Sequence, residues 1–148
     1  MGCADGTMLR ILSPHFKVAY GVEADALAFP NQAPNVISAR AEALPFANDS
    51  FNTVICSATR KHLRDPIPVV AEMTRVLRPR GRLIILDPNP LLVQIGMKLG
   101  KFDSRYIRNN SWARQIRNEM ESFGLRTIHA KNGLFVQCVG EKPSPVAR

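Results

Sequence analysis

The chain has 148 residues, of which 45% are hydrophobic and 22% are charged, and its formal net charge is +8. This length and balance fit one globular domain that buries a core, and they exclude a disordered chain. No apolar run approaches the roughly 20 residues that span a bilayer, and the amino end lacks the charged and apolar regions of a secretory signal. We therefore expect a cytoplasmic protein with one domain, residues 1–142, and a short tail, residues 143–148.

The cysteines and the basic residues narrow the function classes further. Cys3, Cys56 and Cys138 are odd in number, far apart and placed in or beside apolar runs, so we expect reduced thiols. No His, Cys, Asp or Glu cluster has the spacing of a metal site, so we expect no metal. The basic residues form short groups that do not alternate with aromatics, which disfavours nucleic acid as a partner.

The first half of the chain alternates strand-like and helix-like segments. MGCADGTMLRIL begins with a glycine-rich turn and continues into a short helix that ends before Pro14. FKVAYGVEAD (16–25) predicts a strand with an acidic end, followed by a helical turn over 26–29, and NVISA (35–39) predicts a short strand. FNTVICSA (51–58) is apolar enough for a strand buried on both faces. Such alternation is typical of a parallel sheet covered by helices.

In the next segments a helix, a strand and an apolar insertion follow. DPIPVVAEMTRVLRPRG (65–81) has apolar residues at helical spacing and predicts a helix closed by Pro79 and Gly81. RLIILDP (82–88) predicts the next strand. LLVQIGMKLGKF (91–102) is apolar and basic, and it lies where α/β enzymes insert a cap over the ligand.

The last part predicts a helix and an antiparallel hairpin. SWARQIRNEMESFG (111–124) has an apolar face, with Ser111 as the expected N-cap and Gly124 as the stop. LRTIHAK (125–131) and LFVQCVGEKP (134–143) predict two strands joined at the turn signal Asn132-Gly133. The sheet should begin parallel and end with an antiparallel pair.

Four segments carry a resemblance to a known family: GCADG (2–6), GVEAD (21–25), AEALPFANDSFNTVICSATRKHLRDP (41–66) and EMTRVLRPRGRLIILDPNP (72–90). In this order and spacing they resemble the class I S-adenosylmethionine-dependent methyltransferases, in the branch with quinone and other small-molecule enzymes. The resemblance implies an α/β, Rossmann-like sheet, mostly parallel with an antiparallel C-terminal hairpin. It also implies S-adenosylmethionine as cofactor and in-line methyl transfer to a small acceptor, which the 91–102 segment suggests is apolar.

The resemblance assigns the glycine-rich turn and the acidic strand end to the cofactor. Gly2, Ala4 and Gly6 match the family's turn beneath the methionine part of the cofactor, and alanine at the middle position is a departure. Glu23 matches the acidic residue whose carboxylate accepts hydrogen bonds from both ribose hydroxyls. Arg80 is a second departure, because the family has a glycine before its fifth strand.

Later segments supply the rest of the implied site. Ala41 and Glu42 match the residues that line the adenine, and Ser57 matches the strand end beside the sulfonium. His62 is the candidate catalytic base for an acceptor that must lose a proton, because an imidazole titrates near neutral pH.

Only Met1 precedes the turn, whereas the family places its first strand there, between the second and fourth strands. We therefore expect an N-terminally truncated domain. Two alternatives stay open: a partner chain or homodimer that donates a strand to the gap, and a rearranged sheet in which the second and fourth strands pair directly. The alternative function is a catalytically inactive methyltransferase-like fragment or binding module, and a lesser one is attachment of 91–102 to a membrane surface.

Overall fold

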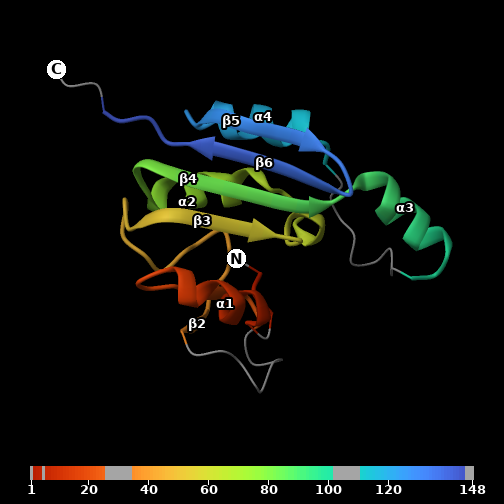
Figure 1. Cartoon of the computed structure of the whole chain (residues 1–148), viewed down its shortest axis with the longest axis horizontal. Coiled ribbons are helices and arrows are strands. Elements are labelled where there is room, and N and C mark those ends of the chain that lie inside the picture. The colour runs from red at the N-terminus through yellow and green to blue at the C-terminus, as the bar shows by residue number, and fades with distance from the viewer. Residues whose placement is uncertain (1, 5, 26–34, 102–110, 146–148) are drawn as a thin grey trace.

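Two separate sheets organise the protein. The computed structural model describes residues 2–4, 6–25, 35–101 and 111–145, and every structural statement concerns these residues (Figure 1). The smaller sheet is a parallel pair, β1 (Gly21–Glu23) and β2 (Val36–Ser38). The larger has four strands in the spatial order β3 (Phe51–Ser57), β4 (Leu77–Pro88), β6 (Phe135–Glu141) and β5 (Arg126–Asn132).

The strand directions confirm the expected α/β architecture. β3 runs parallel to β4, whereas β6 runs antiparallel to both β4 and β5. Parallel pairing at the start and an antiparallel hairpin at the end were both expected from the sequence. The helices are α1 (Thr7–Leu12), α2 (Ile67–Val76), α3 (Pro90–Lys98) and α4 (Ala113–Ser122), with short 3-10 helices η1 (Ser13–His15) and η3 (Arg60–His62).

The core lies between the four-stranded sheet and two helices. Alternate residues of a strand point to the same face, and on one face of β3, β4 and β6 these residues are apolar and buried. Helices α2 and α4 pack their apolar stripes against that face, which removes both from water. The core residues are Val54, Cys56, Leu83, Ile85, Val136 and Cys138 from the strands, Val69, Val70, Met73 and Val76 from α2, and Ala113, Ile116 and Met120 from α4.

Three boundaries differ from the sequence-based expectation. β1 begins at Gly21 instead of residue 16, since residues 16–20 have no strand partner among the described residues. Helix α2 ends at Val76 and not at Pro79, and a proline disfavours helical geometry in the residue before it. Gly81 therefore belongs to β4, whose register against β3 shifts there.

Ser111 is not the N-cap of α4, which is a further correction. The cap position is Trp112, whose side chain makes no capping hydrogen bond. Instead, Asn132 at the end of β5 accepts a hydrogen bond from the Ala113 amide at 2.9 Å. A side chain distant in sequence thus satisfies the helix terminus. Gly124 does follow the helix in left-handed geometry, with φ of 78°.

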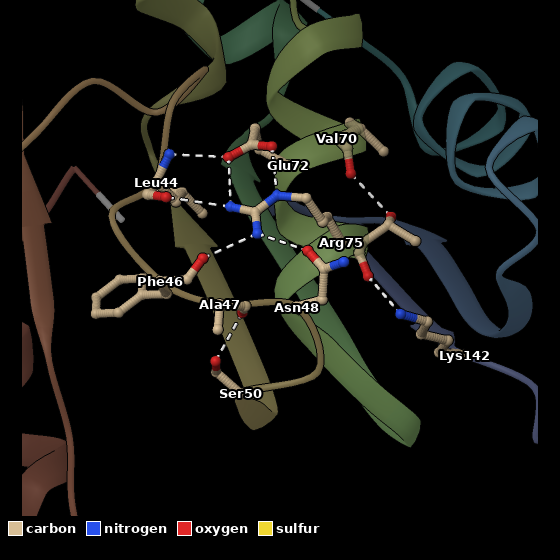
Figure 2. A network of polar contacts seen from close by, with 10 residues as sticks. Leu44, Phe46, Ala47, Asn48, Ser50, Val70, Glu72, Arg75 and Lys142 are labelled. Carbon is tan, nitrogen blue, oxygen red and sulfur yellow. Dashed lines mark hydrogen bonds and ion pairs between the residues drawn. The ribbon is translucent and has the colours of Figure 1, made fainter.

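The segment after β2 is fastened to α2 by one arginine (Figure 2). Arg75 donates two hydrogen bonds to the Glu72 carboxylate, at 2.7 and 2.9 Å. Its other donors reach the carbonyls of Leu44 and Phe46, at 3.1 and 2.8 Å, and the side chain of Asn48 at 2.9 Å. Glu72 in turn accepts from the Leu44 amide at 2.9 Å, so residues 44–48 are held in one position.

The residue that follows β6 makes a set of polar contacts with α2 and β4. β6 ends at Glu141, and the Lys142 ammonium donates to the carbonyls of Thr74 and Leu77 at 3.0 and 2.7 Å.

In the described ranges, no helix has the length and apolar character needed to cross a membrane. The predicted turn over 26–29 lies outside the described residues.

Candidate functional site

A cavity of about 520 Å³ opens at the carboxyl ends of β1 and β3. Ligands of open α/β sheets bind at this edge, where the loops after parallel strands converge. Four segments line it: the glycine-rich turn, the end of β1, the loop after β2 and the loop after β3. The lining residues are Gly2, Ala4, Val22, Glu23, Ala24, Ala39, Arg40, Ala41, Glu42, Ser57, Ala58, Thr59, His62 and Leu63.

The glycine-rich turn is clamped between the two strand ends. The Gly2 amide donates to the Val22 carbonyl at 2.9 Å, and Gly2 has φ of 62°. A Cβ on Gly2 would stand 2.0 Å from the Thr59 hydroxyl oxygen, so no side chain fits. Ala4 has φ of 47°, a left-handed geometry that costs an L-residue about 1–2 kcal/mol. This explains why glycine suits the position where the sequence has alanine.

Glu23 ties the turn to the end of β1. One carboxylate oxygen accepts from the Ala4 amide at 2.9 Å. The other accepts from the amides of Ala24 and Asp25, at 2.9 and 3.4 Å. A carboxylate offers about four acceptor sites, so these three hydrogen bonds leave one for a ligand. A second ligand hydroxyl would have to displace the longest of these hydrogen bonds, the one from the Asp25 amide.

The loop after β2 forms the opposite wall. Ala39 and Ala41 are half-buried small residues that line the cavity. The Glu42 carboxylate pairs with the Arg40 guanidinium at 3.3 Å, and the Arg40 side chain is 78% exposed. The Arg40–Glu42 pair therefore lies at the cavity mouth, and the alanines contribute the inner surface.

The loop after β3 carries the strained backbone that is frequent at binding sites. Ala58 has φ of 51°, and its amide donates to the Leu86 carbonyl of β4 at 2.7 Å. The 3-10 helix η3 follows and places His62 on the cavity wall. Its amide donates to the Thr59 carbonyl at 3.0 Å, which fixes the turn.

A buried ion cluster anchors this loop from behind. Arg60 is 1% exposed, and its guanidinium pairs with Glu119 of α4 at 2.8 Å and with Asp87 of β4 at 3.6 Å. It also donates to the Ser111 hydroxyl at 3.2 Å. Burial raises the pKa of Asp87 to about 6, while the positive charge of Arg60 opposes that rise. The cluster joins the loop to β4 and α4.

Most of the predicted site residues meet in this one cavity. Gly2, Ala4, Glu23, Ala41, Glu42 and Ser57 line it, together with His62. Gly6 does not: it is buried, adopts φ of 81° and forms the N-cap of α1. Within the described residues no group of three or more His, Cys, Asp or Glu side chains is placed to hold a metal ion.

Sequence reasoning missed Thr59 and Arg60. Thr59 resembles an ordinary loop residue, and nothing in its neighbourhood signals contact with Gly2. Arg60 looks like part of an exposed basic run, RKHLR. A signal did exist for Arg60, because Asp87 ends the next parallel strand and the ends of neighbouring parallel strands lie side by side.

Comparison with known proteins decides the family. A family model described as a methyltransferase domain matches residues 1–85. The chain belongs to this methyltransferase family. The ubiquinone/menaquinone biosynthesis C-methyltransferase UbiE of Pasteurella multocida is 42% identical over 53 residues, which are 36% of this chain and 20% of that protein. The uncharacterized methyltransferase YcgJ of Bacillus subtilis is 29% identical over 127 residues, 75% of this chain and 50% of that protein.

Solved structures share the fold of this methyltransferase domain. The YcgJ crystal structure superimposes with a TM-score of 0.74 at 17% identity, covering 97% of this chain and 90% of that one. A SAM-dependent methyltransferase from Archaeoglobus fulgidus superimposes with a TM-score of 0.74 at 15% identity, covering 95% and 83%. The aligned part of the chain is only 20–26% of the length of the UbiE relatives.

Proposed function

We propose that the protein transfers a methyl group from S-adenosylmethionine to a small, apolar acceptor. The observation that carries the proposal is the meeting of Gly2, Glu23 and Ser57 in one cavity at the carboxyl ends of β1 and β3. These residues come from three distant parts of a methyltransferase-family chain. Their convergence at the ligand-binding edge of the sheet is what a nucleoside cofactor requires.

The cavity suits S-adenosylmethionine in size and chemistry. Its volume of about 520 Å³ lies within the roughly 300–1,000 Å³ of small-molecule sites. We assign the ribose hydroxyls to Glu23, whose carboxylate keeps one open acceptor site and holds the amide of Asp25 only at 3.4 Å. We assign the methionine part to the turn of Gly2, Ala4 and Gly6, in which Gly6 acts by shaping the start of α1.

The loops after β2 and β3 would hold the adenine and the methyl-donating end of the cofactor. We assign the adenine to Ala41 and Glu42, beside the small side chain of Ala39. Ser57 ends β3 and lines the same cavity as the turn and His62. A bound S-adenosylmethionine supplies a methyl group that its sulfonium already activates. The chain therefore has to align the acceptor and exclude water, and His62 takes a proton only where the acceptor must lose one.

The apolar acceptor is inferred from α3. This helix directly follows β4, and its entry is fixed by Asn89, whose side chain accepts from the Leu91 amide at 2.9 Å. Leu91 and Ile95 on this helix and Leu99 directly after it are 51–68% exposed. Such a surface next to the ligand edge favours an apolar substrate. The relatives named for ubiquinone and menaquinone biosynthesis support the same choice, and the free cysteines fit the expected cytosolic setting.

Calorimetric titration with S-adenosylmethionine and with S-adenosylhomocysteine tests the proposal. Both ligands should bind, because they share the adenosine and amino-acid parts, whereas ATP should not. Glu23→Ala should weaken binding about 10- to 150-fold, since hydrogen bonds to a charged group contribute about 1.5–3 kcal/mol. Glu121→Ala, on the exposed side of α4, is the matched control and should leave the affinity unchanged. Equal affinities for both variants would contradict the site.

A further inference from the structure

Exposed apolar side chains gather at one end of the molecule, where β4 ends. Three segments carry them: α3 with the residue after it, the residue before α4, and the turn that joins β5 to β6. Figure 1 shows α3 beyond the carboxyl end of β4 and beside that turn. We call these residues the end patch, and their side chains are 40–71% exposed: Leu91, Leu92, Ile95, Leu99, Trp112, Leu134 and Phe135.

Two asparagine side chains join the three segments of the end patch. Asn89, directly before α3, donates from its side-chain amide to the Gly133 carbonyl at 2.6 Å. Its backbone amide also donates to the Leu134 carbonyl at 3.2 Å. On the other side of the turn, Asn132 accepts from the Ala113 amide at 2.9 Å. The apolar side chains therefore stand on one fixed surface and not on three independent segments.

Helix α3 carries more apolar surface than its packing uses. Val93 and Gly96 are buried, and they lie on one side of the helix. Leu91, Ile95 and Leu99 follow one another at a spacing of four, so they share another side, which is exposed. An exposed apolar stripe of this kind marks an interaction with a protein or a membrane.

The charged side chains on these segments are all basic. Lys98, Lys101, Arg114 and Lys131 are exposed, and none of the four has an acidic partner among the described residues. Residues 88–101, 111–118 and 127–137 contain no Asp or Glu. The end patch is therefore an apolar surface within a field of positive charge, and its partner should be apolar and anionic.

This combination selects a lipid surface over a second copy of the chain. Two end patches brought together would set the same unpaired cations against each other, which opposes association. An anionic bilayer instead offers phosphates to the ammonium groups and acyl chains to the leucines. Lysine side chains keep their charge in water while their stems lie on apolar surface, and tryptophan favours the boundary between headgroups and acyl chains.

We propose that the end patch docks on the surface of an anionic lipid bilayer. The apolar side chains enter the boundary between headgroups and acyl chains, and the basic side chains contact the phosphates. The docking is independent of the proposed function, because it needs neither a cofactor nor an acceptor.

The place of the end patch in the fold gives the docking a consequence for the reaction. Ser57 is in register with Leu86, and β3 and β4 run parallel, so the end patch begins at the same edge of the sheet as the cavity. Docking brings that edge to the bilayer, in which an apolar acceptor dissolves. If the proposed function holds, the bilayer is the source of the acceptor, and this consequence alone rests on that function.

Fluorescence reports the docking directly, because the single tryptophan of the chain, Trp112, belongs to the end patch. The whole chain is mixed with vesicles of equal parts phosphatidylcholine and phosphatidylglycerol, and with vesicles of phosphatidylcholine alone. On the first vesicles the emission should shift to shorter wavelength, and brominated acyl chains should quench it. Sedimentation with the vesicles measures the affinity, which should fall as the salt concentration rises.

Loss of apolar side chains should weaken vesicle binding. The double variant Ile95→Gln with Leu134→Ser should bind at least tenfold more weakly, because two side chains no longer leave water. Ile11→Gln with Val18→Ser is the matched control, since these side chains are 61% and 64% exposed elsewhere in the molecule. It should bind like the wild type. If Ile95→Gln lowers the Tm, Leu99→Gln, directly after the helix, takes its place.

Loss of charge at the end patch should act separately. Lys98→Gln with Lys131→Gln should weaken binding roughly 25-fold, since each cation near an anionic surface contributes about fivefold. Lys17→Gln with Arg80→Gln removes the same net charge from exposed positions outside the end patch. Its binding should stay within about threefold of the wild type, because exposed charges farther than a Debye length are largely screened.

Four outcomes decide the proposal. An unchanged Trp112 emission with anionic vesicles at low salt would overturn it, and so would equal binding by the end-patch and control variants. Self-association without lipid that Ile95→Gln with Leu134→Ser abolishes, in a chain that binds no vesicles, would assign the surface to a second copy and overturn it. Titration with S-adenosylmethionine separates the two claims. Cofactor binding without vesicle binding would contradict the end patch alone, and vesicle binding without cofactor binding would support it and contradict the proposed function.

Discussion

Removal of the Arg60 charge should destabilise the protein in a pH-dependent way. Arg60 is 1% exposed and is paired with Asp87 and Glu119, whose side chains are 7% and 10% exposed. Loss of one partner from a buried ion pair typically costs about 3–5 kcal/mol, because the remaining charge is left uncompensated. We expect Arg60→Met to lower the free energy of unfolding by this amount at pH 8.

Protonation of Asp87 should relieve much of that cost. Burial already raises the pKa of Asp87 to about 6, and removal of Arg60 takes away the positive charge that opposes the rise. Below pH 6 the carboxyl of the variant is therefore neutral, and only Glu119 stays unpaired. At pH 5 the loss from Arg60→Met should fall to roughly half, about 1.5–2.5 kcal/mol.

Urea unfolding of the wild type and of Arg60→Met at pH 5 and pH 8 measures the loss of unfolding free energy at each pH. The double variant Arg60→Met with Asp87→Asn should recover about half of the lost stability at pH 8, since it removes one of the two unpaired charges and leaves that of Glu119. Arg114→Met on the exposed side of α4 is the control, because arginine and methionine have similar helix propensities. A loss below about 1 kcal/mol at pH 8, or equal losses at the two pH values, would refute the reasoning.

Three further outcomes follow from the backbone and the polar network. Ala4→Gly should stabilise the chain by about 0.5–1 kcal/mol in thermal unfolding, because relief of left-handed strain exceeds the added glycine entropy; a lower Tm would contradict the assigned geometry. Gly2→Ala should lower the Tm and abolish S-adenosylmethionine binding, since its Cβ would meet Thr59 at 2.0 Å; unchanged binding would speak against it. Arg75→Met should lower the Tm more than Arg114→Met, because five hydrogen bonds are lost; equal shifts would count against the network.

Local pattern was sufficient to predict the elements whose partners are near in sequence or whose faces are strongly apolar. The run 51–58 became β3, the stripe around Ile116 and Met120 became the buried face of α4, and the Asn132-Gly133 signal marked the hairpin. Among the described residues β1 and β3 do not pair directly, so the rearranged sheet that the sequence left open as an alternative is not observed.

Features that depend on distant partners could not be predicted in this way. Asn132 caps α4 from the far end of β5, and no propensity of residues 111–113 reveals that contact. Residues 16–20 have the composition of a strand, but among the described residues they have no strand partner, and residues 16–18 form bends. The positive φ of Arg80, 64°, does explain why glycine is favoured at that position in the family.

The most direct test of the central claim is a titration of ¹⁵N-labelled protein with S-adenosylmethionine, followed amide by amide. The account predicts saturable shifts at the amides of Ala4, Ala24, Ala41 and Ala58, which surround the cavity on all four segments. It predicts no shifts along β5, which lies at the other edge of the four-stranded sheet. An absence of shifts at millimolar cofactor, or shifts confined to β5 and its neighbours, would contradict it.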